Sequence, residues 1–392
     1  MIKCPKIEKF IKIWYNKGGL GRLYLFGGIH MIYLDANAFY WYLGRENLFA
    51  QPSTPRHNIE KLNKFLDTRN DKGIPASAFL EMIVHFRDDP DKIKKIIRFR
   101  ETKGIPVFNN FVDYCFTPDE LTALHLTTSN TILTDYAYKL LDKKIDIEVK
   151  HTYVFLQIVS ILYADYYLKT YASLDTGKRE QILSYLGRIL SNEMRSDLCT
   201  QLTAALKTGY ADNNRVQQAL KEKYIELLVQ NCVIFHMIID TAVKFLDDGN
   251  DLYETMCKSA AEAKNNGFTN DEIMQTIKAA LNTDSAFLQT AENEIASIFE
   301  RKGYSKHQAK YMKTMLKAWL ERGQKLIKND IFDMLCVGCL DKTVVNPSLN
   351  VLVDQSSYLI SFDKAMMNFL CGNAGNVRLL NQFLFPQYLL TV

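Results

Sequence analysis

The stretch Met31-Ile32-Tyr33-Leu34-Asp35-Ala36-Asn37 decides the fold. Its apolar run stops at an aspartate, and an aromatic run, Ala38–Leu43, follows at once. A short apolar run bounded by polar residues predicts a buried strand, and the run after it predicts a helix. Strands that lead directly into helices are typical of α/β folds, in which parallel strands are covered on both faces.

The same pattern returns at both ends of the chain. Gly73-Ile74-Pro75 predicts a second strand, which turns at Ser77 into a helix over Ala78–Phe86. Ser357–Ile360 predicts another strand, followed by a helix over Lys364–Phe369, and Asn376–Leu380 predicts the last one. Further helices are predicted over Ile59–Leu66, Asp91–Thr102 and Ile331–Leu340. We therefore expect one mostly parallel sheet that is assembled from the two ends of the chain.

The middle of the chain, from about Asp119 to Lys325, has a different pattern. Apolar residues recur there at helical spacing, without β-alternation or internal repeats, which predicts a helical bundle. The predicted helices are Val149–Tyr171, Gln181–Leu190, Asn214–Phe245, Asp271–Leu281, Ala286–Phe299 and Lys306–Trp319. The expected organisation is an N-terminal arm (1–30), a first α/β part (31–107), an all-helical insertion domain (108–323) and a second α/β part (324–392). Met31, where the first clear strand begins, is an alternative start.

Composition narrows the class of protein. A chain of 392 residues exceeds one ordinary core, and 47% hydrophobic with 23% charged residues excludes a disordered chain. Eight scattered cysteines predict reduced, buried thiols in a cytoplasmic protein, and the Cys336-x-x-Cys339 pair lacks the further ligands of a zinc site. The apolar stretches are too short for a membrane span. A net charge of +4 permits a nucleic-acid partner without requiring one.

Acidic residues stand at unexpected places, namely Asp35, Glu81, Asp330, Asp333 and Asp363. Two of them end apolar strands, and the carboxyl ends of parallel strands form the ligand crevice of such sheets. Glu81 is the only charge in the apolar run Phe79–His85. Asp330 and Asp333 are three residues apart and share one face at the start of a helix. Several carboxylates are therefore expected to meet at one edge of the sheet.

Each carboxylate also has a structural explanation. Asp35, Asp330 and Asp363 could be helix N-caps, the more common role for any one of them, and Asp333 suits the helix dipole. Glu81 resists this explanation, because a carboxylate on a buried helix needs a partner, a raised pKa or a metal. Taken together, the five predict a site for Mg²⁺ or Mn²⁺, which prefer carboxylate oxygens and water as ligands.

With their surroundings, these residues resemble the motifs of PIN-domain nucleases. In that family an apolar strand is followed by D-x-[NST], a glutamate stands in an apolar helix after a strand, a helix starts with N-D-x-x-[DIA], and a strand ends in [TS]-x-D. The matching stretches are Ile32–Asn37, Pro75–Glu81, Asn329–Asp333 and Tyr358–Lys364. The resemblance covers Met31–Val107 and Gln324–Val392, and roughly 250 residues separate its second and third motifs, far more than a connection needs.

The resemblance implies an α/β/α sandwich with a central, mostly parallel sheet, interrupted here by the helical insertion. It implies that Asp35, Glu81, Asp363 and either Asp330 or Asp333 hold one or two Mg²⁺ or Mn²⁺ ions, with Asp330 favoured by its place after Asn329. Asn37 and Ser361 would orient the carboxylates or the attacking water. The implied reaction is the hydrolysis of phosphodiester bonds, most often in RNA.

Other features leave alternatives open. Lys94, Lys95 and Arg98 of the basic helix, and Lys364, would contact phosphates, but the same lysines equally describe a solvated helix face. His85 lies one turn after Glu81 and is expected to be a packed histidine or to support the site. The alternative to a nuclease is a catalytically silent PIN-like module that acts through a regulatory protein partner. A DNA nuclease is a further alternative, and a homo-oligomer is compatible with either function.

Overall fold

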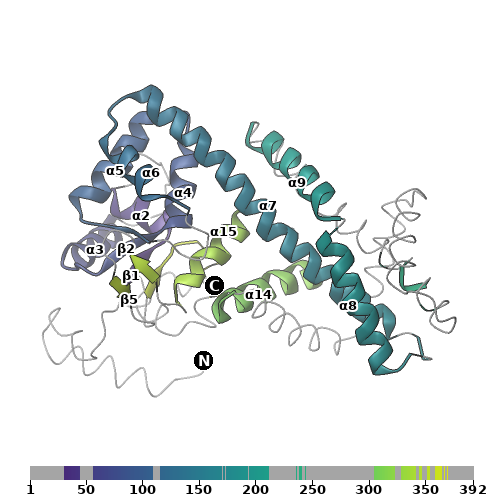
Figure 1. Ribbon diagram of the computed structural model, residues 1–392. Coiled ribbons are helices and arrows are strands. Elements are labelled where there is room, and N and C mark those ends of the chain that lie inside the picture. The colour runs from purple at the N-terminus through teal and green to yellow at the C-terminus, as the bar shows by residue number, and fades with distance from the viewer. Residues whose placement is uncertain are drawn as a thin grey trace, which may run out of the picture.

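Four short strands form one parallel sheet in the order β3-β2-β1-β6 in the computed structural model (Figure 1). The strands are β1 (Ile32–Leu34), β2 (Lys72–Pro75), β3 (Val107–Phe108) and β6 (Tyr358–Ile360). Tyr33 of β1 is in register with Gly73 on one side and with Leu359 on the other. The first strand is therefore paired with a strand from the far end of the chain, and the expected parallel α/β sheet is confirmed.

The structure describes residues 31–44, 56–108, 115–169, 171–172, 174–192, 194–211, 235, 238–240, 243, 304–322, 328–340, 344–346, 351–353, 358–363, 366 and 369. Several predictions fall outside the described residues: the arm 1–30, the helices Asp271–Leu281 and Ala286–Phe299, most of Asn214–Phe245, the strand Asn376–Leu380, and Lys364.

The strand order creates a switch point between β1 and β6. The chain moves from β1 outwards to β2 and β3, and it later returns to β6 on the opposite side of β1. At such a point the connections leave the carboxyl ends of two neighbouring strands in opposite directions, which opens a crevice between them. The backbone N–H of Asp35 continues the β1–β6 pairing by donating to the carbonyl of Ile360 at 3.0 Å. The residues that follow β1 and β6 therefore lie side by side.

The helices of the α/β part differ from the prediction mainly at their first turns. They are α2 (Ala36–Tyr42), α3 (Arg56–Asp67), α4 (Ala76–His85), α5 (Pro90–Thr102) and α15 (Lys328–Val337), which continues as the 3₁₀ turn η3 (Gly338–Leu340). Helix α4 starts at Ala76, so Ser77 lies inside it rather than before it. Helix α15 starts at Lys328, so Asp330 lies in its first turn and the capping explanation is wrong for this residue.

Glycine at position 73 lets an aromatic ring cross the sheet. A Cβ atom at Gly73 would lie 2.1 Å from Cε2 of Phe108, which is closer than any real contact. The Phe108 ring packs edge-to-face on Tyr33, with the ring centroids 5.4 Å apart. The edge strand β3 is thereby tied to β1 across β2. With only two residues, β3 is too short to produce the periodic pattern that predicts strands.

Helices alone make up the described residues between 115 and 211 and between 304 and 322. They are α6 (Pro118–Leu126), α7 (Asn130–Leu168), α8 (Thr176–Asn192), α9 (Met194–Ala211) and α14 (Lys306–Arg322). The 39-residue α7 packs against α4, α5 and α15 and also against α8 and α9, and it links the two parts of the molecule (Figure 1). It begins 19 residues before the predicted start, and its first half buries Leu133, Ala137, Leu140 and Ile145 together with the charged Lys144 and Glu148.

A hairpin between α15 and β6 was not predicted. Its strands β4 (Val344–Asn346) and β5 (Val351–Val353) pair antiparallel, with Asn346 opposite Val351. In the part of the chain that the structure describes, no helix is both long and apolar enough to cross a membrane.

Candidate active site

Asp35 lies at the carboxyl end of β1 and has two hydrogen-bond donors. Its Oδ1 accepts from the backbone N–H of Ala36 at 2.7 Å, so Asp35 caps α2. Its Oδ2 accepts from the hydroxyl of Ser361 at 2.7 Å. Burial raises the pKa of Asp35 to about 6, the two hydrogen bonds act in the opposite direction, and the charge of Asp363 adds to the rise. Asp35 can therefore cap α2 and belong to a carboxylate site at the same time.

The loop after β6 arranges Asp363 in a similar way. Its backbone N–H donates to Oγ of Ser361 at 3.1 Å, and its Oδ1 accepts from the N–H of Met366 at 2.9 Å. Ser361 is fully buried and thus joins the ends of β1 and β6. This is the contact expected if Ser361 orients Asp35.

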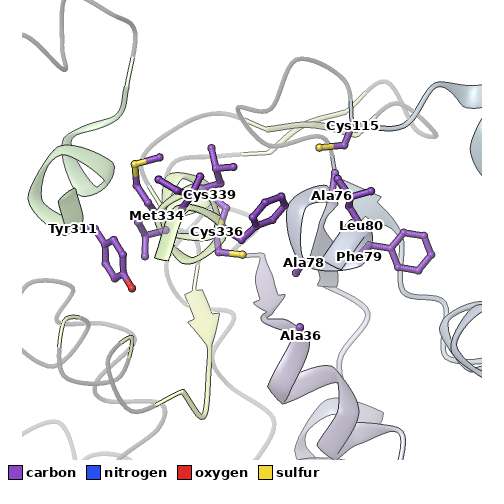
Figure 2. Packing of buried hydrophobic residues seen from close by; sticks show 14 of the residues in the cluster. Ala36, Ala76, Ala78, Phe79, Leu80, Cys115, Tyr311, Met334, Cys336 and Cys339 are labelled. Atoms are coloured by element: carbon purple, nitrogen blue, oxygen red, sulfur yellow. The ribbon is translucent and has the colours of Figure 1, made fainter. Parts of the chain in front are cut away.

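Helices α4 and α15 bring two further carboxylates to the same place. Ser77 of α4 lies with its Oγ 3.3 Å from Sγ of Cys336 on α15, and Figure 2 shows the Cys336 side chain between α15 and Ala78. Glu81 is one turn after Ser77, and Asp333 is three residues before Cys336, so each acid shares a helix face with a residue of this contact. Glu81 and Asp333 therefore lie on the faces of α4 and α15 that contain the contact between the two helices.

The predicted acids converge on Asp333. Burial raises the pKa of the Asp333 carboxyl well above its usual range, and the charges of Asp35, Glu81, Asp363 and Asp330, in that order, raise it further. We call the five residues Asp35, Glu81, Asp330, Asp333 and Asp363 the carboxylate cluster. Asp333 is the member on which the charges of all four others act.

The charges of the cluster fit a divalent cation. The charges with the largest effect on Asp35 and Asp333 are those of other carboxylates, so like charges face one another at this place. Such an arrangement needs protons or a cation to offset it. Among the described residues, however, no three histidine, cysteine, aspartate or glutamate side chains are placed closely enough to hold one ion as they stand.

The remaining predicted residues stand apart from this centre. Asn37 is half-buried in the first turn of α2. Lys94 pairs with Asp91 at 3.8 Å, and Lys95 and Arg98 are exposed on α5, which leads into the edge strand β3 on the side of β1 away from β6. His85 is exposed rather than packed, because α4 ends there.

Two residues of the site were not predicted. The hydroxyl of Tyr311 on α14 donates to Oδ2 of Asp333 at 3.3 Å. Tyr311 has no distinct signal in the sequence, because its spacing with Met312 and Met315 describes an ordinary apolar helix face. Cys336 was interpreted as a buried thiol, which the structure confirms, and its position three residues after Asp333 could have placed it on the same face. Burial, and next the charge of Asp35, raise the pKa of the Cys336 thiol well above its usual range.

Comparisons with known proteins give no match, since no family model fits the sequence and no curated protein or solved structure is detectably similar to it.

Proposed function

We propose that this protein is a PIN-like, metal-dependent nuclease that hydrolyses phosphodiester bonds, with RNA as its substrate. The observation that carries the proposal is that the charges of four other carboxylates, Asp35, Glu81, Asp363 and Asp330, act on the half-buried Asp333. Helix capping explains Asp35 and Asp363 one at a time, but it does not explain why Glu81 and Asp333 lie with them. The choice of RNA over DNA rests on the resemblance to PIN-domain nucleases.

The position of the cluster also supports an enzyme. It lies where β1 and β6 end, at the switch point of a parallel sheet, which is the usual ligand crevice of this architecture. Carboxylate oxygens are the ligands that Mg²⁺ and Mn²⁺ prefer. Carboxylates are therefore the type of donor that suits the cation implied by the resemblance, and the mutual repulsion of the acids is a physical reason for them to bind it.

In this proposal Asp35, Glu81, Asp333, Asp363 and, at the rim, Asp330 would hold the cation. When bound, such an ion neutralises phosphate charge and lowers the pKa of water. Ser361 keeps Asp35 turned towards Asp363 through its 2.7 Å hydrogen bond. The buried contact of Ser77 with Cys336 holds α4 against α15, the two helices that carry Glu81 and Asp333.

The proposal is tested by cleavage of end-labelled single-stranded RNA and DNA in Mn²⁺, Mg²⁺ or EDTA. We expect cleavage of RNA that requires the metal. Asp363→Asn should reduce the rate by roughly 100-fold or more, because it removes one cluster charge. The fold should survive, because the asparagine Oδ1 can still accept from the N–H of Met366. Preparing the variant by the same procedure controls for contaminating nucleases.

Each outcome of this assay has a definite meaning. Metal-dependent cleavage of DNA alone would leave the cluster as the active site but correct the substrate. Equal cleavage by wild type and Asp363→Asn would remove the cluster from the reaction. No cleavage of either polymer, together with no stabilisation by Mn²⁺, would favour the catalytically silent, regulatory protein instead.

A further inference from the structure

Helix α14 is fixed at its start by two sets of hydrogen bonds. Ser305 and Gln308 cap it reciprocally: the N–H of Gln308 donates to Oγ of Ser305 at 3.2 Å, and the N–H of Ser305 donates to Oε1 of Gln308 at 2.9 Å. Both residues are buried. The preceding residue, Tyr304, has its hydroxyl 2.6 Å from Nδ1 of His151 on α7. The first turn of α14 is therefore held in place and anchored to the long helix of the insertion.

Tyr311 extends from this fixed helix into the carboxylate cluster. Its side chain is only 3% exposed, and its ring packs edge-to-face on Phe369 with the centroids 5.0 Å apart. Figure 2 shows the Tyr311 ring beside α15, which carries Asp333. Besides burial, the charges of Asp333, Asp330 and Asp363 act on the Tyr311 hydroxyl. The charges of three carboxylates from two chain segments therefore act on a hydroxyl of the insertion, and Asp333 accepts its hydrogen bond.

We propose that Tyr311 is a positioning residue of the carboxylate cluster, whose hydroxyl holds Asp333 from helix α14 so that the helical insertion completes the metal site. The inference rests on the proposed function and adds a role for the insertion. A carboxylate that accepts a hydrogen bond from a fixed donor keeps one orientation. Less side-chain conformational entropy is therefore lost when a cation binds. The long interruption between the second and third motifs then supplies part of the site.

The proposal predicts a specific loss in Tyr311→Phe. The phenylalanine ring keeps the packing on Phe369 and removes only the hydroxyl that Asp333 accepts from. Loss of such a supporting hydrogen bond typically weakens metal affinity by roughly 10- to 100-fold. We expect the dissociation constant for Mn²⁺, measured by titration calorimetry without nucleic acid, to rise by about this factor. The KM for RNA at saturating Mn²⁺ should stay unchanged.

Tyr153→Phe is the matched control. The Tyr153 hydroxyl is also buried and hydrogen-bonded, but its partner at 2.8 Å is Gln157 on the same helix α7. This variant should bind Mn²⁺ as the wild type does. In an Asp333→Asn background, Tyr311→Phe should cause no further loss of affinity, because the two groups act as one unit.

The outcomes separate this inference from the proposed function. Wild-type affinity for Mn²⁺ in Tyr311→Phe would overturn the role of Tyr311 and leave the nuclease proposal intact. An equal loss in Tyr153→Phe, or an additive loss in the Asp333→Asn background, would show a general structural effect and would also overturn it. Failure of the wild-type protein to bind Mn²⁺ would overturn both proposals.

Discussion

Replacing Asp35 with asparagine is expected to stabilise the metal-free protein at neutral pH while it abolishes metal-dependent cleavage. Burial of Asp35 raises its pKa from 3.8 to about 6, which is about two pKa units. Each unit corresponds to about 1.4 kcal/mol, so the charged carboxylate costs up to roughly 3 kcal/mol of folding free energy. Asparagine removes this charge, and its Oδ1 can still cap α2 through the N–H of Ala36.

The stabilisation should depend on pH in a defined direction. The pKa of Asp35 is raised in the folded state, so its contribution to stability is fully present below the unfolded value of 3.8 and is lost as pH rises through about 6. The difference between Asp35→Asn and wild type should therefore be small near pH 4 and largest above pH 7. Urea unfolding in EDTA at several pH values measures it.

Asp67→Asn is a control with the opposite sign. The Asp67 carboxylate accepts from the hydroxyl of Tyr42 at 2.6 Å and from Nζ of Lys103 at 2.6 Å. Although burial acts in the other direction, the hydrogen bonds from Lys103 and Tyr42 lower the pKa of Asp67, so loss of this charge should destabilise the protein at neutral pH. If Asp35→Asn is instead less stable than wild type at pH 7.5 in EDTA, the charge of the Asp35 carboxylate does not destabilise the folded protein. The prediction would then be wrong.

Lys144→Met is expected to be the most destabilising single change outside the cluster. Lys144 and Glu148 of α7 form an ion pair with side chains that are 3% and 1% exposed. The Tyr210 hydroxyl donates to Oε1 of Glu148 at 2.8 Å and accepts from Nζ of Lys144 at 2.6 Å. Without the lysine, Glu148 would be left as a buried, uncompensated charge, which typically costs about 3–5 kcal/mol.

The effect of Lys144→Met should extend to the helix that carries Asp333. Nζ of Lys144 lies 3.8 Å from the ring centroid of Phe332, the residue before Asp333. We expect a large fall in the urea midpoint at pH 7. Most of it should be recovered in the double variant with Glu148→Gln, whose side chain can still accept from Tyr210. A loss under about 1 kcal/mol in the single variant would contradict a desolvated ion pair on the side of α7 that contacts α15.

The sequence was most informative at positions where a charged residue stands among apolar neighbours. Asp35 and Asp363 could be predicted because each interrupts an apolar strand, and Glu81 because a lone charge in an apolar helix needs a reason. Parallel strands then bring the first two together by geometry alone. The convergence of these residues with α15 needed the fold, because helix packing is not encoded in the spacing of any one segment.

Other features of the fold and the site could not be predicted from the sequence, and each has a physical reason. The Tyr311 contact depends on the docking of α14 onto α15, which no local pattern specifies. Strand β3 has only two residues, which is too few for a periodic signal. The pairing of strands β4 and β5 with each other is a contact that no local pattern specifies. Asp330 was considered as an N-cap because it stands just before the predicted helix Ile331–Leu340, but the helix begins three residues earlier, at Lys328.

The most direct test of the metal site is anomalous X-ray diffraction at the manganese edge from crystals grown with Mn²⁺. The account predicts an anomalous peak at the carboxyl ends of β1 and β6, bordered by Asp35, Asp363 and Asp333. The peak should be lost in Asp35→Asn crystals grown under the same conditions. Absence of a peak at the carboxylate cluster in wild-type crystals at saturating Mn²⁺ would contradict the account.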